Sequence, residues 1–312
     1  MAATKGSYGI AEWYGRLFHT LSSPDRSKLL DEQNVMPCRF MADLPALAPR
    51  TGLECNKKGG VCSIRNYADG PDGLSFGPIT STCPYRFLED GLIVREIGKA
   101  LLGTETPIVI KEIPFLRRTA RAKPIDKPPE SIKDGVDPGI SREDVGKIDM
   151  VCVHPDKDPL TWCAVEMQAV YFSGGKIEKD FEVLRQHSGN SIPLPGAKRR
   201  PDFRSSGPKR LMPQLQIKVP TLRRWGKKMA VVVDEEFFAS LGPIAAEPHP
   251  SNADIAWVIL RYRDDTIRGL AKMELKEILY CTLERAVEGL TAGTPTTQDE
   301  FEKNLKRRMQ KR

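Results

Sequence analysis

Two short segments in which apolar residues alternate with polar ones most constrain the fold of this chain. They span residues 146–153 and 163–170, and both are rich in β-branched residues, which is typical of strands. The link between them, residues 154–160, contains the prolines and aspartates of a turn. The sequence therefore predicts an antiparallel hairpin whose turn is centred between Lys157 and Asp158.

This hairpin brings two acidic residues together. In the predicted register Asp149 faces Glu166, with their Cβ atoms about 5 Å apart. Gln168 shares the face of Glu166, because side chains alternate along a strand. Two adjacent carboxylates repel each other unless a cation lies between them, and oxygen ligands with room for water suit Mg²⁺. The pattern therefore predicts a magnesium site at Asp149 and Glu166.

A magnesium site of this kind can hydrolyse a phosphodiester. The metal lowers the pKa of the attacking water and neutralises the charge on the phosphate. Gln168 can orient the water but adds no positive charge, so we expect the metal to supply more of the electrostatic stabilisation. In the alternative interpretation Asp149 caps a strand and Glu166 is a solvated surface residue. Since Asp followed by Glu-x-Gln is a short pattern that is frequent by chance, the pattern alone leaves both interpretations open.

Several further motifs, in one order along the chain, resemble those of the NotI-like type II restriction endonucleases. They are Thr-Cys-Pro-Tyr-Arg-Phe (82–87), Gly-Lys-Ile-Asp-Met-Val (146–151), Glu-Met-Gln-Ala-Val-Tyr-Phe-Ser-Gly (166–174), Arg-Ser-Ser-Gly-Pro-Lys-Arg-Leu (204–211) and Trp-Gly-Lys-Lys-Met-Ala-Val-Val-Val-Asp (225–234). The resemblance runs from the first cysteines to about residue 235. The family belongs to the PD-(D/E)xK nuclease superfamily and has Glu-x-Gln in place of Glu-x-Lys. It implies an α/β fold with a restriction-endonuclease-like core, in which helices flank a mixed central β-sheet.

The resemblance also implies an activity. It is the Mg²⁺-dependent, sequence-specific hydrolysis of both strands of duplex DNA, at a GC-rich palindrome, by a homodimer paired with a cognate DNA methyltransferase in a restriction-modification system. Asp149 and Glu166 would bind Mg²⁺, and Gln168 would orient the water. The third catalytic carboxylate is Glu96, in a predicted helix over residues 87–102, or Glu112, in a predicted strand over residues 107–116; the family pattern favours Glu112. As an alternative, Glu112 is a solvent-facing edge residue.

Four cysteines lie early in the chain, in a glycine-rich segment that lacks the apolar periodicity of a self-supporting core. They are Cys38, Cys55, Cys62 and Cys83. Such a segment needs an additional interaction to stabilise its fold, and a tetrahedral four-cysteine metal site can provide it. The spacing alone favours ordinary buried thiols, because no Cys-x-x-Cys pair is present. The family resemblance implies a structural iron site here, with zinc as the alternative for the same ligands.

The most basic part of the chain is the segment 198–228, in which eleven Lys and Arg residues accompany one acid, Asp202. Lysine and arginine neutralise phosphates, and arginine in the major groove recognises guanine. We expect loops and a short helix that bind DNA; the alternative is a basic surface loop that only aids solubility. The predicted DNA-binding residues are Arg199, Arg200, Arg204, Lys209, Arg210, Arg223 and Arg224.

Composition agrees with a nucleic-acid enzyme without deciding the matter. The 312 residues carry a formal net charge of +7, which many proteins that never bind nucleic acid share. No segment has the length of a membrane span, and the first residues lack the apolar core of a signal peptide. The seven cysteines are an odd number, so reduced thiols and a cytoplasmic location are expected. Cys152, Cys163 and Cys281 are expected to be packing residues.

The chain divides into three predicted regions. A helix and the four-cysteine metal region occupy residues 1–90, the nuclease core residues 91–292, and a basic tail residues 293–312. Within the core we expect an insertion at 117–141, strands at 229–233 and 255–262, and helices at 177–187, 234–241 and 273–290. Two other functions stay open, namely a metal-stapled DNA-binding protein without catalytic activity and a nuclease with a repair role.

Overall fold

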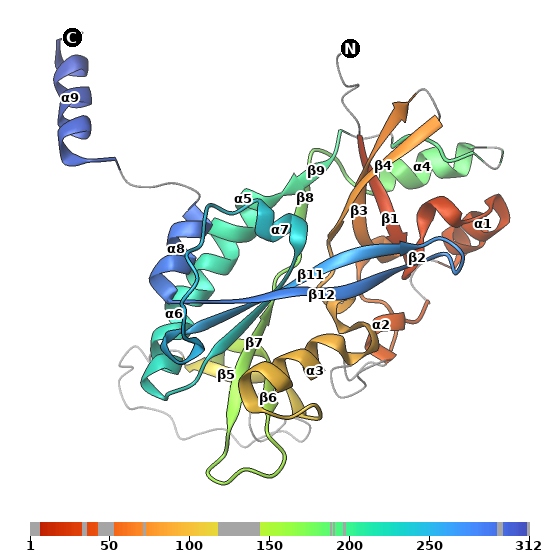
Figure 1. The fold of residues 1–312 in the computed structure, drawn as a ribbon. Coiled ribbons are helices and arrows are strands. Elements are labelled where there is room, and N and C mark those ends of the chain that lie inside the picture. Colours follow the sequence, from red (N-terminus) through yellow and green to blue (C-terminus); the bar gives the residue numbers. More distant parts are fainter. Residues whose placement is uncertain are drawn as a thin grey trace, which may run out of the picture.

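The structure is a computed structural model that describes residues 7–32, 36–42, 53–70, 73–117, 144–187, 189, 191–195, 198–291 and 296–310. It confirms a mixed α/β architecture built on one six-stranded sheet (Figure 1). The predicted insertion at 117–141 lies outside the described residues apart from Arg117. None of the helices in the described ranges is long and apolar enough to cross a membrane.

The six-stranded sheet has the order β12-β11-β10-β7-β6-β5. Strand β10 runs parallel to its neighbours β7 and β11, and the other neighbouring pairs are antiparallel. All six residues of β10 are buried, as expected for a central strand with both faces covered. The strands are β5 (Ile108–Arg117), β6 (Asp144–Val153), β7 (Trp162–Met167), β10 (Met229–Asp234), β11 (Ile255–Asp265) and β12 (Leu270–Cys281).

Strands β6 and β7 form the predicted hairpin in the predicted register. Met150 pairs with Val165, and Cys152 pairs with Cys163. The next position along this ladder places Asp149 opposite Glu166. The register is confirmed, because the prolines and aspartates of the link and the alternating apolar residues fix the same alignment.

Helices cover both faces of the central sheet. The helical segment of η4 (Pro84–Gly91), α3 (Leu92–Ile97) and η5 (Gly98–Leu102) packs on one face, and α6 (Met212–Arg224) and α8 (Leu283–Thr291) pack on the other. Successive side chains of a strand point to opposite faces of the sheet. Val232 therefore packs on the face covered by α3, and Val231 packs on the face covered by α6 and α8. The three predicted packing cysteines are confirmed as buried core residues: Cys152, Cys163 and Cys281.

The N-terminal region forms a second, four-stranded antiparallel sheet in the order β2-β1-β3-β4. Its strands are β1 (Ser7–Trp13), β2 (Arg16–Leu17), β3 (Val61–Gly70) and β4 (Gly73–Ser81), and short helices accompany it, namely η1 (Phe18–Thr20), α1 (Ser23–Asp31), α2 (Arg39–Ala42) and η3 (Lys58–Gly60). The expectation of a loop-like cysteine segment without a core is therefore wrong. Ile64 and Tyr67 of β3 are buried with Trp13, and the partner Phe181 comes from the distant helix α4 (Glu178–Gln186). A core assembled from distant segments leaves little apolar periodicity in any one of them.

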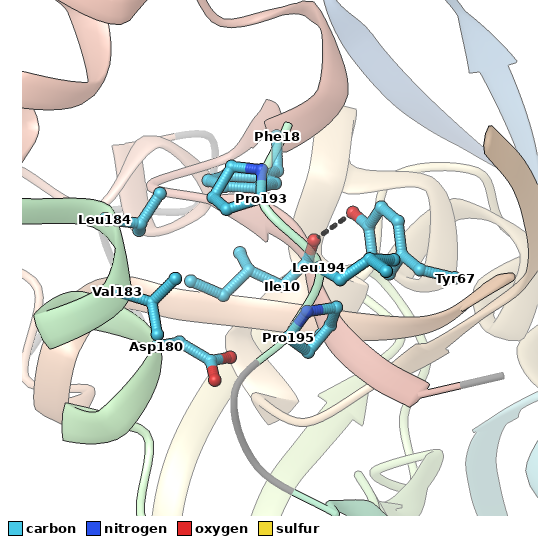
Figure 2. Close-up of a pocket in the computed structure, with 10 residues that line it drawn as sticks. Ile10, Phe18, Tyr67, Asp180, Val183, Leu184, Pro193, Leu194 and Pro195 are labelled. Atoms are coloured by element: carbon cyan, nitrogen blue, oxygen red, sulfur yellow. Dashed lines mark hydrogen bonds between the residues drawn. The ribbon is translucent and has the colours of Figure 1, made fainter. Parts of the chain in front are cut away.

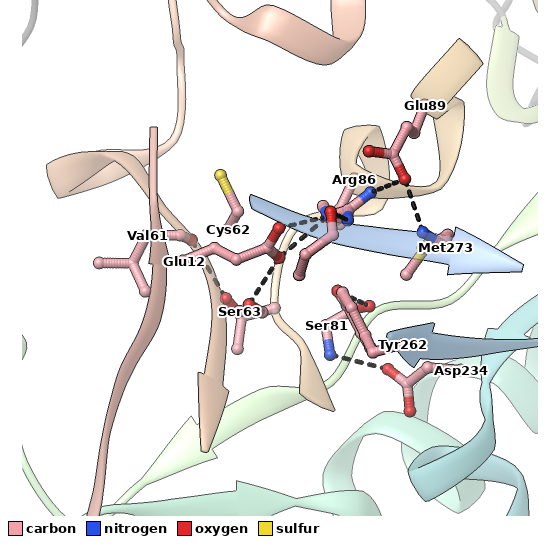
Figure 3. A network of polar contacts seen from close by, with 12 residues as sticks. Glu12, Val61, Cys62, Ser63, Ser81, Arg86, Glu89, Asp234, Tyr262 and Met273 are labelled. Carbon is pink, nitrogen blue, oxygen red and sulfur yellow. Dashed lines mark hydrogen bonds and ion pairs between the residues drawn. The ribbon is translucent and has the colours of Figure 1, made fainter. Parts of the chain in front are cut away.

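A buried polar network joins the N-terminal sheet to the central sheet (Figure 3). Arg86 has no exposed surface, and its Nε donates to both carboxylate oxygens of Glu12 at 2.9 Å. The same guanidinium binds Glu89 at 3.1 Å, and Glu89 accepts from the backbone of Met273 in β12 at 2.7 Å. Ser63 of β3 donates to Glu12 at 2.7 Å. Because removing one partner of a buried ion pair leaves an uncompensated charge, this network fixes how the two sheets pack.

The C-terminal part of the core corrects one further prediction. Residues 273–290 were expected to be one helix, but β12 extends to Cys281 and helix α8 begins at Leu283. Leu275, Ile278 and Leu279 are spaced as on a helix, which explains the error. Long antiparallel pairing with β11, from Ile255↔Cys281 to Asp265↔Leu270, decides the strand, because it adds β12 to the edge of the central sheet.

The basic segment is more helical than expected. After a short pairing of β8 (Tyr171–Ser173) with β9 (Arg200–Asp202), the chain runs through α5 (Phe203–Ser206) and η6 (Gly207–Leu211) into α6. Leu215, Val219 and Leu222 form an apolar stripe buried against the sheet, and this packing stabilises the helix despite its prolines. The remaining helices are α7 (Glu235–Ala239), η7 (Pro250–Asn252) and α9 (Gln298–Met309). None of the residues of α9 is buried, and the helix lies apart from the body of the molecule (Figure 1).

Candidate active site

Asp149 and Glu166 lie opposite each other at the end of the β6–β7 hairpin, one position beyond the pair Met150↔Val165. The Asp149 carboxylate accepts a hydrogen bond from the backbone of Met167 at 3.2 Å. Glu166 is only 2% exposed. Burial raises the pKa of Glu166 to about 8, and the charge of Asp149 and a hydrogen bond between the two side chains act in the same direction. A pair of crowded carboxyl groups with one deeply buried is suited to bind a cation.

Lys218 contacts this pair through Glu166. It lies on α6, is 4% exposed, and its Nζ donates to Glu166 and, at 2.8 Å, to Gln214. The sequence prediction did not include Lys218 among the site residues. The signal was present, because Lys218 falls on the buried stripe of α6 between Leu215 and Leu222, where a charge requires a partner. The site therefore has a positive charge of its own, although its motif has Gln168 in place of lysine.

Gln168 follows directly on β7 and is 8% exposed. Its backbone N–H donates to Val232 of β10 at 3.0 Å, which continues the pairing of the two strands. Its side-chain amide donates to the carbonyl of Ala169 at 2.5 Å. Gln168 also lines a pocket of about 330 Å³, together with its neighbours Met167 and Ala169. This position is compatible with holding a water molecule, the role expected for Gln168.

Glu112 lies opposite Asp149 on β5, between the pairs Lys111↔Met150 and Ile113↔Ile148. Its φ of +51° is unusual for a residue other than glycine, and such strain is often found at functional sites. Its exposed carboxylate accepts a hydrogen bond from Lys147 at 3.0 Å. In the described ranges no three His, Cys, Asp or Glu residues are grouped closely enough to hold a metal, so Glu112 does not complete the site in this structure.

Glu96, the alternative third carboxylate, lies on α3. Its carboxylate is 3.9 Å from the Nζ of Lys99, one helical turn away on a partly exposed face. This pair is a surface interaction of the kind that contributes little to stability.

The four N-terminal cysteines come together from different elements. Burial raises the pKa of the Cys83 thiol to about 11, and the charges of Cys38 and Cys55 contribute in the same direction. Burial likewise raises the pKa of Cys62, with contributions from Glu12, Cys83 and Cys55. The four thiols are thus within electrostatic range of one another. They are not at ligand spacing, because the described residues include no metal-binding group of three or more.

The predicted DNA-binding residues fall into two groups. Arg199 is 2% exposed and binds Asp180 at 2.6 Å, and Arg223 binds Asp254 at 2.5 Å, so these charges are compensated within the protein. The others are exposed along β9, α5, η6 and the end of α6: Arg200, Arg204, Lys209, Arg210 and Arg224.

A second cavity lies between the N-terminal sheet and α4 (Figure 2). Ile10, Tyr67 and Leu184 are among the residues that line it. Its volume of about 20 Å³ has room for about one water molecule. The cavity is therefore a packing defect and cannot hold a nucleotide.

Comparison with known proteins identifies the family model that fits this chain. Residues 26–273 match the model described as restriction endonuclease NotI. No curated protein matches the sequence. The matched range includes the hairpin with its acidic pair, helix α6 and all four N-terminal cysteines.

Proposed function

The chain belongs to the NotI family of restriction endonucleases, and from this premise we propose that it is a type II enzyme that hydrolyses both strands of duplex DNA at a specific site. The observation that carries the proposal is the pair of the half-buried Asp149 and the buried Glu166 at the end of the β6–β7 hairpin. The proposed fold type is that of the PD-(D/E)xK nucleases. The proposed target is a GC-rich palindrome, and the proposed biological partner is a cognate DNA methyltransferase.

In the proposed mechanism Asp149 and Glu166 hold Mg²⁺. The donor set fits this ion, because two adjacent carboxylates supply hard oxygen ligands and their mutual repulsion is relieved by a cation. When bound by these carboxylates, Mg²⁺ would supply a lower pKa for the attacking water and positive charge next to the phosphate. Gln168 orients the water, and Glu112, opposite Asp149, assists as a further ligand or base.

The proposal is tested by changing the acidic pair without changing its shape. We expect Asp149→Asn and Glu166→Gln to lower DNA cleavage more than about 100-fold, because the ligand charge is lost, while DNA binding is retained. Asp156→Asn is the matched control, since it makes the same change in the exposed turn of the same hairpin. Near-normal cleavage by Asp149→Asn in Mg²⁺ would show that the assignment is wrong.

The pattern of products separates the remaining alternatives. A site-specific enzyme gives discrete fragments from a long natural DNA, whereas a repair nuclease nicks at damaged or distorted positions. A DNA-binding protein without catalytic activity gives neither product, and its DNA binding is insensitive to Asp149→Asn. A digest of undamaged DNA therefore decides among the three functions.

We also propose that Cys38, Cys55, Cys62 and Cys83 hold one structural metal, iron or alternatively zinc, as the family resemblance implies. Three of these thiols, Cys38, Cys62 and Cys83, are buried and Cys55 is half-buried, and the electrostatic influence of the thiols on one another supports this proposal. Four thiolates leave no open position for water, so the role of this metal is structural.

A further inference from the structure

A polar pocket of about 330 Å³ is lined by the residues that directly follow Glu166 in the chain. Met167, Gln168 and Ala169, which follow Glu166 directly, form one wall. Gln214 of α6 lies on another wall and binds Lys218, which in turn binds Glu166. The pocket is therefore connected to Glu166 on two sides, along the chain through Met167 and across to α6 through Gln214 and Lys218.

Two cations from distant segments line this pocket. Lys57 comes from the cysteine segment, and its Nζ donates to the carbonyl of Thr82, another lining residue, at 2.5 Å. Arg210 comes from η6, and its guanidinium lies 3.8 Å from the centre of the Tyr171 ring, which also lines the pocket. Each cationic group thus contacts another residue of the pocket wall.

The charged side chains that line the pocket favour the binding of an anion. No acidic side chain is among the described residues that line it, whereas Lys57 and Arg210 both contribute positive charge. The amides of Gln168 and Gln214 add neutral polar groups. A tetrahedral oxyanion that accepts hydrogen bonds from an ammonium and a guanidinium matches this arrangement.

We propose that this pocket binds one phosphate of the DNA backbone next to the Asp149–Glu166 pair, with Lys57 and Arg210 as its cationic contacts. The identity of the ligand as DNA rests on the proposed function. The inference gives the cysteine segment a direct part in the active site, because this segment carries Lys57 to the pocket.

The test measures DNA binding by the full chain without added Mg²⁺, so that no cleavage is required. Fluorescence anisotropy of a labelled duplex is recorded over a range of salt concentrations for Lys57→Met, Arg210→Met and the double variant. Each single change should weaken binding roughly fivefold at physiological salt and lower the slope of log affinity against log salt by about 1. The double variant should also lower the slope by about 1, since both side chains contact the same phosphate.

Two control variants separate the pocket from the general charge of the protein. Lys58→Met changes the adjacent lysine, whose side chain is 82% exposed and ion-paired with Glu178, and should bind DNA like the wild type. Lys57→Arg preserves the charge and should preserve the slope, which excludes a mere loss of folding. Unchanged slopes in both single variants, or a loss of about 2 in the double variant, would overturn the proposal.

Inorganic phosphate distinguishes the source of the ligand. At constant ionic strength phosphate should displace DNA from the wild type better than chloride does, and this difference should vanish in the double variant. If phosphate competes in this way but both single variants bind DNA normally, the pocket takes free phosphate and the DNA assignment is wrong. Cleavage does not enter these measurements, so an inactive protein that gives the expected slopes contradicts only the proposed nuclease function.

Discussion

Lys218 carries a positive charge to a site whose sequence motif lacks one. The sequence predicted that the metal would supply more of the electrostatic stabilisation, because glutamine stands at position 168. In the structure the Nζ of Lys218 contacts Glu166 inside the protein, so helix α6 contributes the charge that the strand does not. We infer that Lys218 acts through Glu166 as a positioning residue that fixes the orientation of this carboxylate.

Replacing Lys218 by methionine tests this role, because it removes the charge and keeps most of the volume. We expect the single-turnover cleavage rate to fall roughly 100-fold, with Lys218→Arg less affected. We also expect a lower melting temperature above about pH 8, because an ionised Glu166 would be left buried without a counter-ion. DNA affinity should stay unchanged, because Lys218 does not reach the exposed basic surface.

A double variant separates positioning from simple stabilisation. Lys218→Met combined with Glu166→Gln should recover stability above about pH 8, since no carboxylate is then left unpaired, but should not recover cleavage. Lys99→Met, at a surface lysine, is the control and should change neither property. If Lys218→Met cleaves DNA at the wild-type rate, the inferred role is wrong.

At the scale of elements, the sequence predicts most reliably where local signals agree. The β6–β7 register follows from alternation and turn residues within one short stretch, so Asp149 and Glu166 could be placed together in advance. Strand β12 could not be predicted, because Leu275, Ile278 and Leu279 fit a helix and only pairing with β11 selects the strand. Of the candidate site, Lys218 and Lys57 escaped prediction, since their partners are distant in sequence.

The cysteine segment is the element whose stability depends on the proposed metal. We expect Cys83→Ala to lose bound iron or zinc and to lower the melting temperature by about 5 °C or more, because metal binding stabilises the folded segment. Cys281→Ala is the control, since it also removes a buried thiol but lies in the other core layer and should keep the metal. Metal analysis by mass spectrometry checks both variants. The proposal would be contradicted if carefully prepared wild-type protein contained neither iron nor zinc above trace level per chain.

At the scale of the whole molecule, one proposed active site per chain cuts one strand in each binding event. A palindromic target has two-fold symmetry, which a symmetric pair of subunits matches. We therefore expect a homodimer on DNA, in which each subunit contacts one half-site through the exposed basic residues of β9, η6 and α6. Sedimentation of Asp149→Asn with a duplex that contains the cleavage site should give two chains per duplex.

Mixed subunits provide a sharper test of the dimer. When wild-type protein is mixed with an excess of Asp149→Asn and subunits exchange, most active dimers contain one functional site. Such dimers should convert supercoiled circles to nicked circles, because only one strand is cut, whereas wild-type protein alone should give linear DNA. Complete double-strand cleavage by complexes with one chain per duplex, or linear products alone from the mixture, would refute the arrangement. The outcome depends only on how many active sites act together, so it tests the assembly separately from the choice of target sequence.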